Sequence, residues 1–190
     1  MLYLHQNDYY EESIIVKEKW KAFLLLVLVF ALTLPMVVAS ASGNPDSIGA
    51  KAAQSAENLT LEAMLTYALQ DEYLAKDLYA GTLEKFGPRR PFSNIIQAEE
   101  NHIAMLKPLF TKYNAPLPAE QYHSTGPDTI KEALQISKKA EEENIAMYDL
   151  FLKQNLPADV HEVFTALRNA SQNHLSAFER NLEGSNSQHK

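Results

Sequence analysis

Apolar residues recur along four long segments of the chain at the spacing that places them on one face of a helix. Breaker residues separate these segments, among them Gly87-Pro88 after the first and Pro157 before the fourth. No segment alternates between apolar and polar residues as a half-buried strand would. The pattern therefore predicts an all-α fold with helices at residues 61–86, 92–113, 130–152 and 160–184.

The connections between these helices differ in length. Short proline-containing turns join the first two helices and the last two, whereas the middle connection, residues 114–127, is proline-rich and longer than a hairpin needs. Thr60 is placed to cap the first helix, and Thr129 forms a capping box with Glu132 for the third. We therefore predict a four-helix bundle made of two helical hairpins joined by a crossover connection.

Residues of metal-ligand type interrupt the apolar stripes. Glu72 lies two helical turns from both Leu65 and Tyr79, so it faces the core. An ionised carboxylate in a core is costly unless it is protonated, paired with a cation or bound to a metal. Glu99 and His102 have the Glu-x-x-His spacing of ligands in bundle metal sites. The candidate ligands are Glu72, Glu99, His102, Glu141 and His174.

Part of this pattern occurs twice. Residues 98–103 (AEENHI) and 170–175 (ASQNHL) repeat each other. Each copy follows a helix in which a glutamate precedes a tyrosine by two turns, Glu72 before Tyr79 and Glu141 before Tyr148. The repeat indicates a duplicated helical hairpin whose polar residues form a metal site inside the bundle.

Each of these residues also has an ordinary structural explanation. Glu-x-x-His pairs are common on surface helices, and a lone histidine on an apolar face is usually bonded to a core neighbour. The run Glu141-Glu142-Glu143 is also consistent with a solvated face, and Tyr79 and Tyr148 with core aromatics. Their joint occurrence on four core faces, within an internal repeat, favours the metal site.

The amino-acid composition limits the metal ligands and binding partners that the chain can have. The chain of 190 residues has no cysteine, which excludes disulfides, iron–sulfur clusters, thiolate zinc sites and thiol nucleophiles. Carboxylate and imidazole groups must therefore hold any metal. The formal net charge of −7 is spread without a long basic run, so we expect no nucleic-acid partner.

The N-terminal region has the pattern of a targeting segment. Residues 22–39 are nearly all apolar, follow three lysines and precede Ala39-Ser40-Ala41, a small-x-small cleavage pattern. We predict a signal peptide at residues 1–41, with an uncleaved membrane anchor as the alternative. In either case we expect an extracytoplasmic domain, secreted, periplasmic or membrane-anchored.

The remaining domain boundaries follow from composition. Residues 42–58 are rich in Ser, Gly, Ala, Asn and Pro, so we expect a flexible linker there. The bundle is predicted at residues 59–184, and a disordered tail at residues 185–190. The oligomeric state stays open, with a homodimer as one option.

The residues around the candidate ligands resemble those of an uncharacterised ferritin-like family, domain of unknown function 2202 (DUF2202). The motifs that carry the resemblance are DEYLAKDLY at 71–79, ExxH at 99–102, EExNIA at 141–146 and SxNHLxAF at 171–178. The wider relatives, rubrerythrins and ferritins, use such carboxylates and histidines to hold two irons that react with oxygen or peroxide. The resemblance covers about residues 59–183.

The resemblance also implies a role for each candidate residue. The terminal ligands would be Glu72 and Glu141, the bridging ligand Glu99, and the nitrogen ligands His102 and His174. Tyr79 and Tyr148 would bond to ligand carboxylates, and Ser171 would lie beside the ligands without binding the metal.

One position departs from a complete two-iron set. Ser171 stands where the last helix would supply a second bridging glutamate. Three glutamates and two histidines could hold two metals with extra water, or one metal, or form a relic of a site. Glu142, after a rotation of its helix, and Asn144 are further candidate ligands.

Together these observations predict an extracytoplasmic ferritin-like metal-binding protein whose iron, with manganese as an alternative, reacts with oxygen or peroxide. Its activity would be that of a di-iron or mono-iron oxidase or peroxidase, although no catalytic residue is assigned. The alternatives are a non-catalytic metal-binding protein and a purely structural bundle in which Glu–His ion pairs fix the helix register. A membrane partner is expected only if the N-terminal segment is uncleaved.

Overall fold

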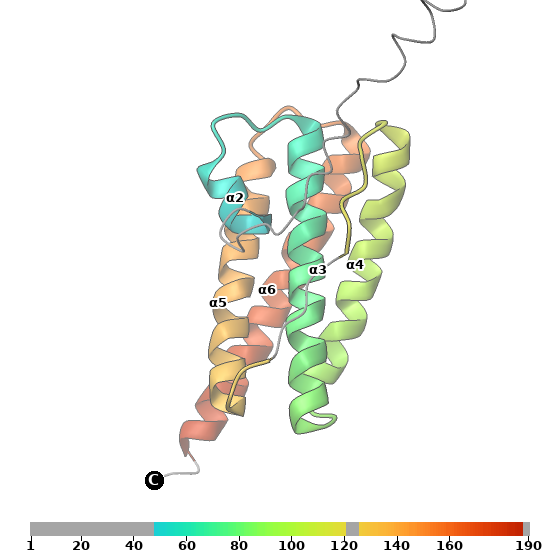
Figure 1. Ribbon diagram of the computed structural model, residues 1–190. Coiled ribbons are helices and arrows are strands. Elements are labelled where there is room, and N and C mark those ends of the chain that lie inside the picture. Colours follow the sequence, from blue (N-terminus) through green and yellow to red (C-terminus); the bar gives the residue numbers. More distant parts are fainter. Residues whose placement is uncertain (1–47, 121–125, 188–190) are drawn as a thin grey trace, which may run out of the picture. The chain divides into compact units, whose positions relative to one another are not determined.

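The computed structural model describes residues 48–120 and 126–187, and this part of the chain contains five helices and no strand (Figure 1). The all-α prediction is therefore confirmed. The helices are α2 (Gly49–Ser55), α3 (Leu61–Phe86), α4 (Phe92–Lys112), α5 (Ile130–Phe151) and α6 (Ala158–Ser187). The predicted signal peptide or anchor at residues 1–41 lies outside the described residues. None of the described helices combines the length and apolar character needed to cross a membrane.

Two of the long helices begin at the predicted caps. Thr60 Oγ1 accepts a hydrogen bond of 3.1 Å from the N–H of Ala63 at the start of α3. Thr129 Oγ1 accepts one of 3.1 Å from the N–H of Glu132 at the start of α5. The Glu132 carboxylate accepts a bond of 2.9 Å from the N–H of Asp128, one residue before the cap. These side chains satisfy backbone donors that the first helical turn leaves unpaired.

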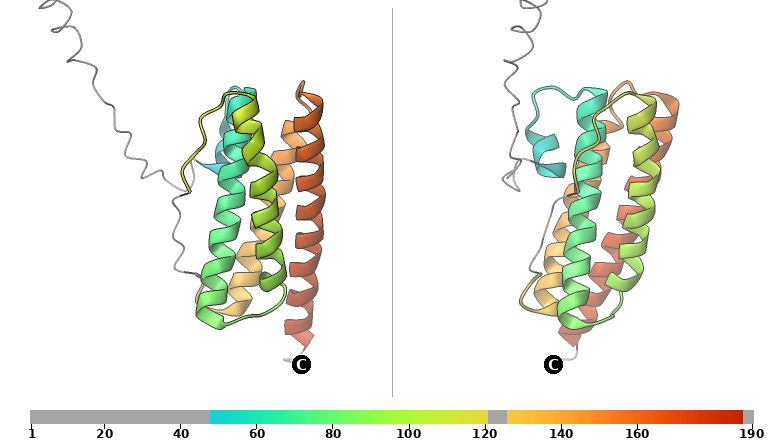
Figure 2. Two further views of the ribbon diagram at one scale, coloured as in Figure 1. Left: turned by 90° about the vertical axis from the view of Figure 1, so that its right-hand side faces the viewer. Right: turned by 45° about the vertical axis from the view of Figure 1, so that its right-hand side comes forward.

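The four long helices lie alongside one another (Figures 1 and 2). α3 and α6 each pack against both α4 and α5. The connection from the end of α4 to the start of α5 joins opposite ends of these helices (Figure 1). Near its end, Gly126 has a φ of +70°, and a Cβ there would lie 3.1 Å from the Gly81 carbonyl oxygen of α3. This close approach holds the connection against α3.

A layer of buried polar residues separates two apolar clusters within these helices. This polar layer consists of Glu72, Glu99, His102, Glu141, Asn144, Ser171 and His174. Tyr148 and Phe164, with ring centroids 5.5 Å apart, belong to the larger cluster on one side. Tyr79 and Phe178, also 5.5 Å apart, belong to the smaller cluster on the other. Close packing in both clusters fixes the helices that carry the polar layer.

Two segments differ from the prediction. Residues 49–55, expected within a flexible linker, form α2, which packs against α3 and α5 and buries Ala50 and Ala53. Small residues allow this close approach, but they carry no large apolar stripe that would mark a helix in the sequence. α6 continues to Ser187 instead of stopping at Gly184, which does not adopt the positive φ of a terminating glycine.

Replacing Thr129 by Ala should lower the free energy of unfolding by about 1 kcal/mol, because the first turn of α5 loses its side-chain acceptor. Urea unfolding followed by circular dichroism measures the change. Thr129→Ser keeps the hydroxyl and serves as the matched control, so equal losses in both variants would contradict the capping role.

Candidate metal centre

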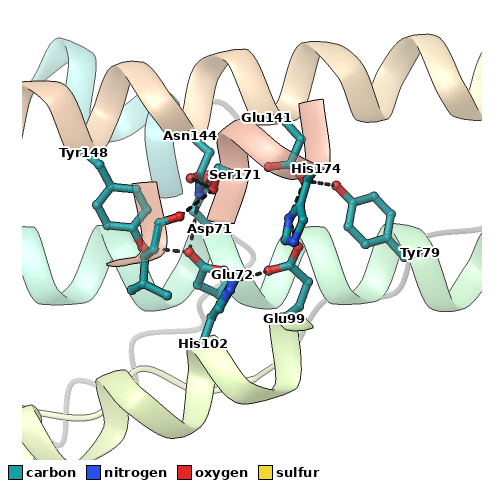
Figure 3. A network of polar contacts seen from close by, with 11 residues as sticks. Asp71, Glu72, Tyr79, Glu99, His102, Glu141, Asn144, Tyr148, Ser171 and His174 are labelled. Carbon is teal, nitrogen blue, oxygen red and sulfur yellow. Dashed lines mark hydrogen bonds and ion pairs between the residues drawn. The ribbon is translucent and has the colours of Figure 1, made fainter. Parts of the chain in front are cut away.

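Each long helix contributes ligand-type side chains to the polar layer (Figure 3). The contributions are Glu72 from α3, Glu99 and His102 from α4, Glu141 from α5 and His174 from α6. They form two sets of three, within each of which the candidate ligand atoms lie within 4.8 Å of one another. We call these the Glu72 group (Glu72, Glu99, His102) and the Glu141 group (Glu99, Glu141, His174). The five ligands chosen from the sequence thus meet in one place, and these buried groups could hold a metal ion.

Glu99 belongs to both groups. Its Oε2 lies 2.8 Å from Nδ1 of His102, and its Oε1 lies 3.2 Å from Nδ1 of His174. The two imidazole rings stack with their centroids 5.5 Å apart. A single carboxylate therefore presents one oxygen to each histidine.

The remaining contacts of the Glu72 group are short. Oε2 of Glu72 lies 3.0 Å from Nδ1 of His102. Oε1 of Glu72 accepts a hydrogen bond of 2.7 Å from the hydroxyl of Tyr148. The tyrosine thus fixes one carboxylate oxygen while the other faces the histidine.

The Glu141 group has a related but looser geometry. Oε1 of Glu141 accepts a hydrogen bond of 2.7 Å from the hydroxyl of Tyr79 and lies 3.4 Å from Nδ1 of His174. That nitrogen has no hydrogen-bond partner, although His174 is only 8% exposed. The two tyrosines therefore cross between hairpins, each bonding the glutamate of the other one (Figure 3).

Burial and charge shift the proton affinities of these groups. Burial raises the pKa of Glu72 to about 7, and the charge of Glu99 adds to the rise. Burial alone would lower the pKa of His102, but Glu72 and Glu99 raise it to about 10. Burial alone would also lower the pKa of His174, but the carboxylates of Glu141 and Glu99 raise it to about 9. Burial would raise the pKa of Glu99, but its contacts with both histidines hold it below the usual range. Without a metal, imidazolium groups thus balance the carboxylates.

The spacing of the candidate ligand atoms is compatible with a bound metal ion. Bond lengths of about 2.0–2.2 Å around such an ion place neighbouring ligand atoms roughly 3 Å apart. The N–O separations within the two groups are 2.8–3.4 Å. Nδ1 of His174 makes ion-pair contacts with Glu99 and Glu141 but no hydrogen bond, and a metal would supply a direct partner for this buried atom. Binding would displace the imidazolium protons.

Ser171 breaks the symmetry between the two halves of the polar layer. Its hydroxyl donates a hydrogen bond of 2.7 Å to Oδ1 of Asn144. Nδ2 of Asn144 donates to Oδ2 of Asp71 at 2.7 Å and to Oε1 of Glu72 at 3.5 Å. The hydroxyl of Ser171 and the neutral amide of Asn144 therefore stand in place of the second bridging carboxylate, which the sequence lacks.

Two neighbours of the ligands were misjudged from the sequence. Glu142, considered as a substitute ligand, is exposed and pairs with Lys138 instead of facing the polar layer. Asp71 was missed, although burial raises its pKa to about 7 and its carboxylate holds Asn144. Each of these two residues is adjacent in sequence to a ligand glutamate. Adjacent residues on a helix point about 100° apart, so the apolar stripe that places the glutamate does not show where its neighbour points.

Comparison with known proteins gives a shared fold without an assigned activity. No family model matches the chain. The uncharacterized protein MJ0754 of Methanocaldococcus jannaschii is 29% identical over 62% of this chain and 73% of that protein. The crystal structure of hypothetical protein MJ0754 from Methanococcus jannaschii has a TM-score of 0.61 at 24% identity, covering 69% of this chain and 85% of that chain. The argument for function therefore has to come from the site.

The metal-free protein should lose stability as the pH rises from 7.5 to 10. The pKa values of His102 and His174 lie above the unfolded value of about 6.5. Their stabilising effect is therefore complete below pH 6.5 and is lost progressively as the pH rises from there through the folded values of about 9 and 10, and the part lost above pH 7.5 is about 2 kcal/mol for His174.

Urea unfolding in the presence of a chelator, repeated across this pH range, measures the effect. The double variant His102→Gln and His174→Gln is the control and should show a flatter profile. Identical profiles for the two proteins would contradict the charge balance described above.

Proposed function

We propose that the protein binds two divalent metal ions in the polar layer, one in each group, with Glu99 bridging them. The observation that carries this proposal is that the two oxygens of Glu99 face His102 and His174. Each histidine is also backed by a second glutamate, so each ion would have its own nitrogen and its own terminal carboxylate. Inward ligands from four packed helices are the usual construction of a two-metal carboxylate site.

We further propose that the fold is ferritin-like and that the metal is iron, with manganese as the alternative. Two helical hairpins whose connection joins opposite ends of α4 and α5, and the resemblance to DUF2202, support this assignment. Carboxylates with imidazole suit iron and manganese, although such ligands do not select one metal by themselves. Bound iron would supply redox chemistry with oxygen or peroxide, in an extracytoplasmic protein if the N-terminal segment is a signal peptide or anchor.

The protein's own residues would orient and shield such a site. The hydroxyls of Tyr148 and Tyr79 hold one oxygen each of Glu72 and Glu141, which leaves those glutamates a fixed direction. Burial and the adjacent carboxylate charges raise the pKa of both tyrosines well above 10, so they remain hydrogen-bond donors. The apolar clusters on both sides would restrict access to small molecules.

A second candidate is metal binding without turnover, or a purely structural polar layer. The observation in its favour is that Nδ1 of His102 lies within hydrogen-bond distance of both Glu72 and Glu99, so these residues satisfy one another. Ser171 also leaves the centre with three carboxylates and no second bridge. Metal content and reaction with oxidants separate these alternatives.

Elemental analysis after anaerobic loading should find two ions per chain in the wild-type protein. Glu99→Ala should lose both ions, because the bridge serves both groups, whereas His102→Ala and His174→Ala should each retain one. Glu142→Gln is the matched control, since this exposed residue should leave the content unchanged. Unaltered metal content in Glu99→Ala would remove the bridge from the site.

Ferrous protein should develop a ferric near-ultraviolet absorption band when air or peroxide is admitted. Two oxidised irons per chain would support the proposed redox role. Bound iron that stays ferrous would favour metal binding without turnover, and a folded protein that takes up no metal would favour the structural alternative.

A further inference from the structure

The first turn of α2 is fitted closely to Asp71 of α3. The N–H of Ala50 donates a hydrogen bond of 2.8 Å to Oδ1 of Asp71, and the N–H of Gly49 donates one of 3.2 Å to Oε1 of Gln70. Gly49 has a φ of +58°, and a Cβ there would lie 2.5 Å from Oδ1 of Asp71. Only glycine therefore fits this approach without displacing the carboxylate or the helix.

Asp71 connects α2 with the polar layer. Its second oxygen, Oδ2, accepts the 2.7 Å bond from Nδ2 of Asn144, which also donates to Oε1 of Glu72. Oδ1 of Asn144 accepts from Ser171, so the orientation of the amide is fixed from both sides. A flipped amide would turn its oxygen toward two carboxylates. Figure 3 shows the part of this chain of bonds that runs from Asp71 through Asn144 to Glu72, and the bond from the N–H of Ala50 extends it to α2.

The Glu141 half of the polar layer has no equivalent chain. In the internal repeat Glu141 corresponds to Glu72, so the residues that correspond to Asp71 and Asn144 are Ala140 and Ala75. Neither alanine side chain can make a hydrogen bond. The chain of hydrogen bonds from α2 therefore reaches the Glu72 group and has no counterpart in the Glu141 group.

We propose that α2 is a clamp that sets the metal affinity of the Glu72 group, with Asp71 and Asn144 as its positioning residues. This inference rests on the proposed two-metal function. Asn144 and Tyr148 together hold Oε1 of Glu72, which leaves Oε2 directed at His102. Release of α2 frees Asp71, then the amide of Asn144, and Glu72 loses one of the two groups that orient it.

Asp71→Asn tests the chain with little change in shape. Asp71 accepts bonds from two donors, the N–H of Ala50 and the amide of Asn144, whereas asparagine has one acceptor oxygen for both. In full-length protein titrated with Co²⁺, the wild type should bind two ions. The variant should keep one affinity and lose at least tenfold in the other, and its visible cobalt spectrum should approach that of His102→Ala.

Gly49→Ala tests the same clamp from α2, and Gly126→Ala is its matched control. Both substitutions place a Cβ at positive φ against a neighbour, but the neighbour of Gly126 is the Gly81 carbonyl oxygen of α3 and not Asp71. Gly49→Ala should reproduce the selective loss of Asp71→Asn. Gly126→Ala should lower thermal stability while leaving both Co²⁺ affinities and the spectrum at wild-type values.

The outcomes distinguish the clamp from the proposed function. Two unchanged Co²⁺ affinities in Asp71→Asn and Gly49→Ala would overturn the clamp and leave the two-metal proposal intact. Equal weakening of both ions would also overturn it, because a general loss of packing does not select one group. A wild-type protein that binds no Co²⁺ would overturn both.

Discussion

The shared carboxylate of Glu99 is the interaction on which the polar layer depends. It lies 2.8 Å from one histidine and 3.2 Å from the other, in a polar layer between two apolar clusters. A buried carboxylate without such partners would be strongly destabilising. The other polar residues can therefore be understood by how they complete or orient the two groups that meet at Glu99.

Two states of charge are compatible with this layer. Protonated imidazoles satisfy the carboxylates in the absence of metal, and divalent ions would replace those protons on binding. The arrangement is tighter around His102 than around His174, whose Nδ1 lacks a hydrogen-bond partner. The centre therefore has two unequal halves, even though its ligands come from an internal repeat.

The asymmetry arises where the repeat has diverged. Ser171 takes the position that matches Glu99, and its hydroxyl bonds to Asn144 instead of offering a carboxylate. Asn144 in turn bonds to Asp71, which receives the first turn of α2. A segment outside the repeated hairpins is thus connected to one half of the centre.

The sequence by itself determined the long helices and the inward position of all five candidate ligands, because helical periodicity and end signals are local. Only the tertiary structure decided how these residues meet. The bonds from Tyr79 to Glu141 and from Tyr148 to Glu72 join residues 62 and 76 positions apart, and local spacing does not specify such pairs. The sequence did not predict α2 either, because this helix also depends on contacts between distant residues. Its small residues form no distinctive stripe, and its contact with Asp71 exists only because α3 and α5 present a surface on which it packs.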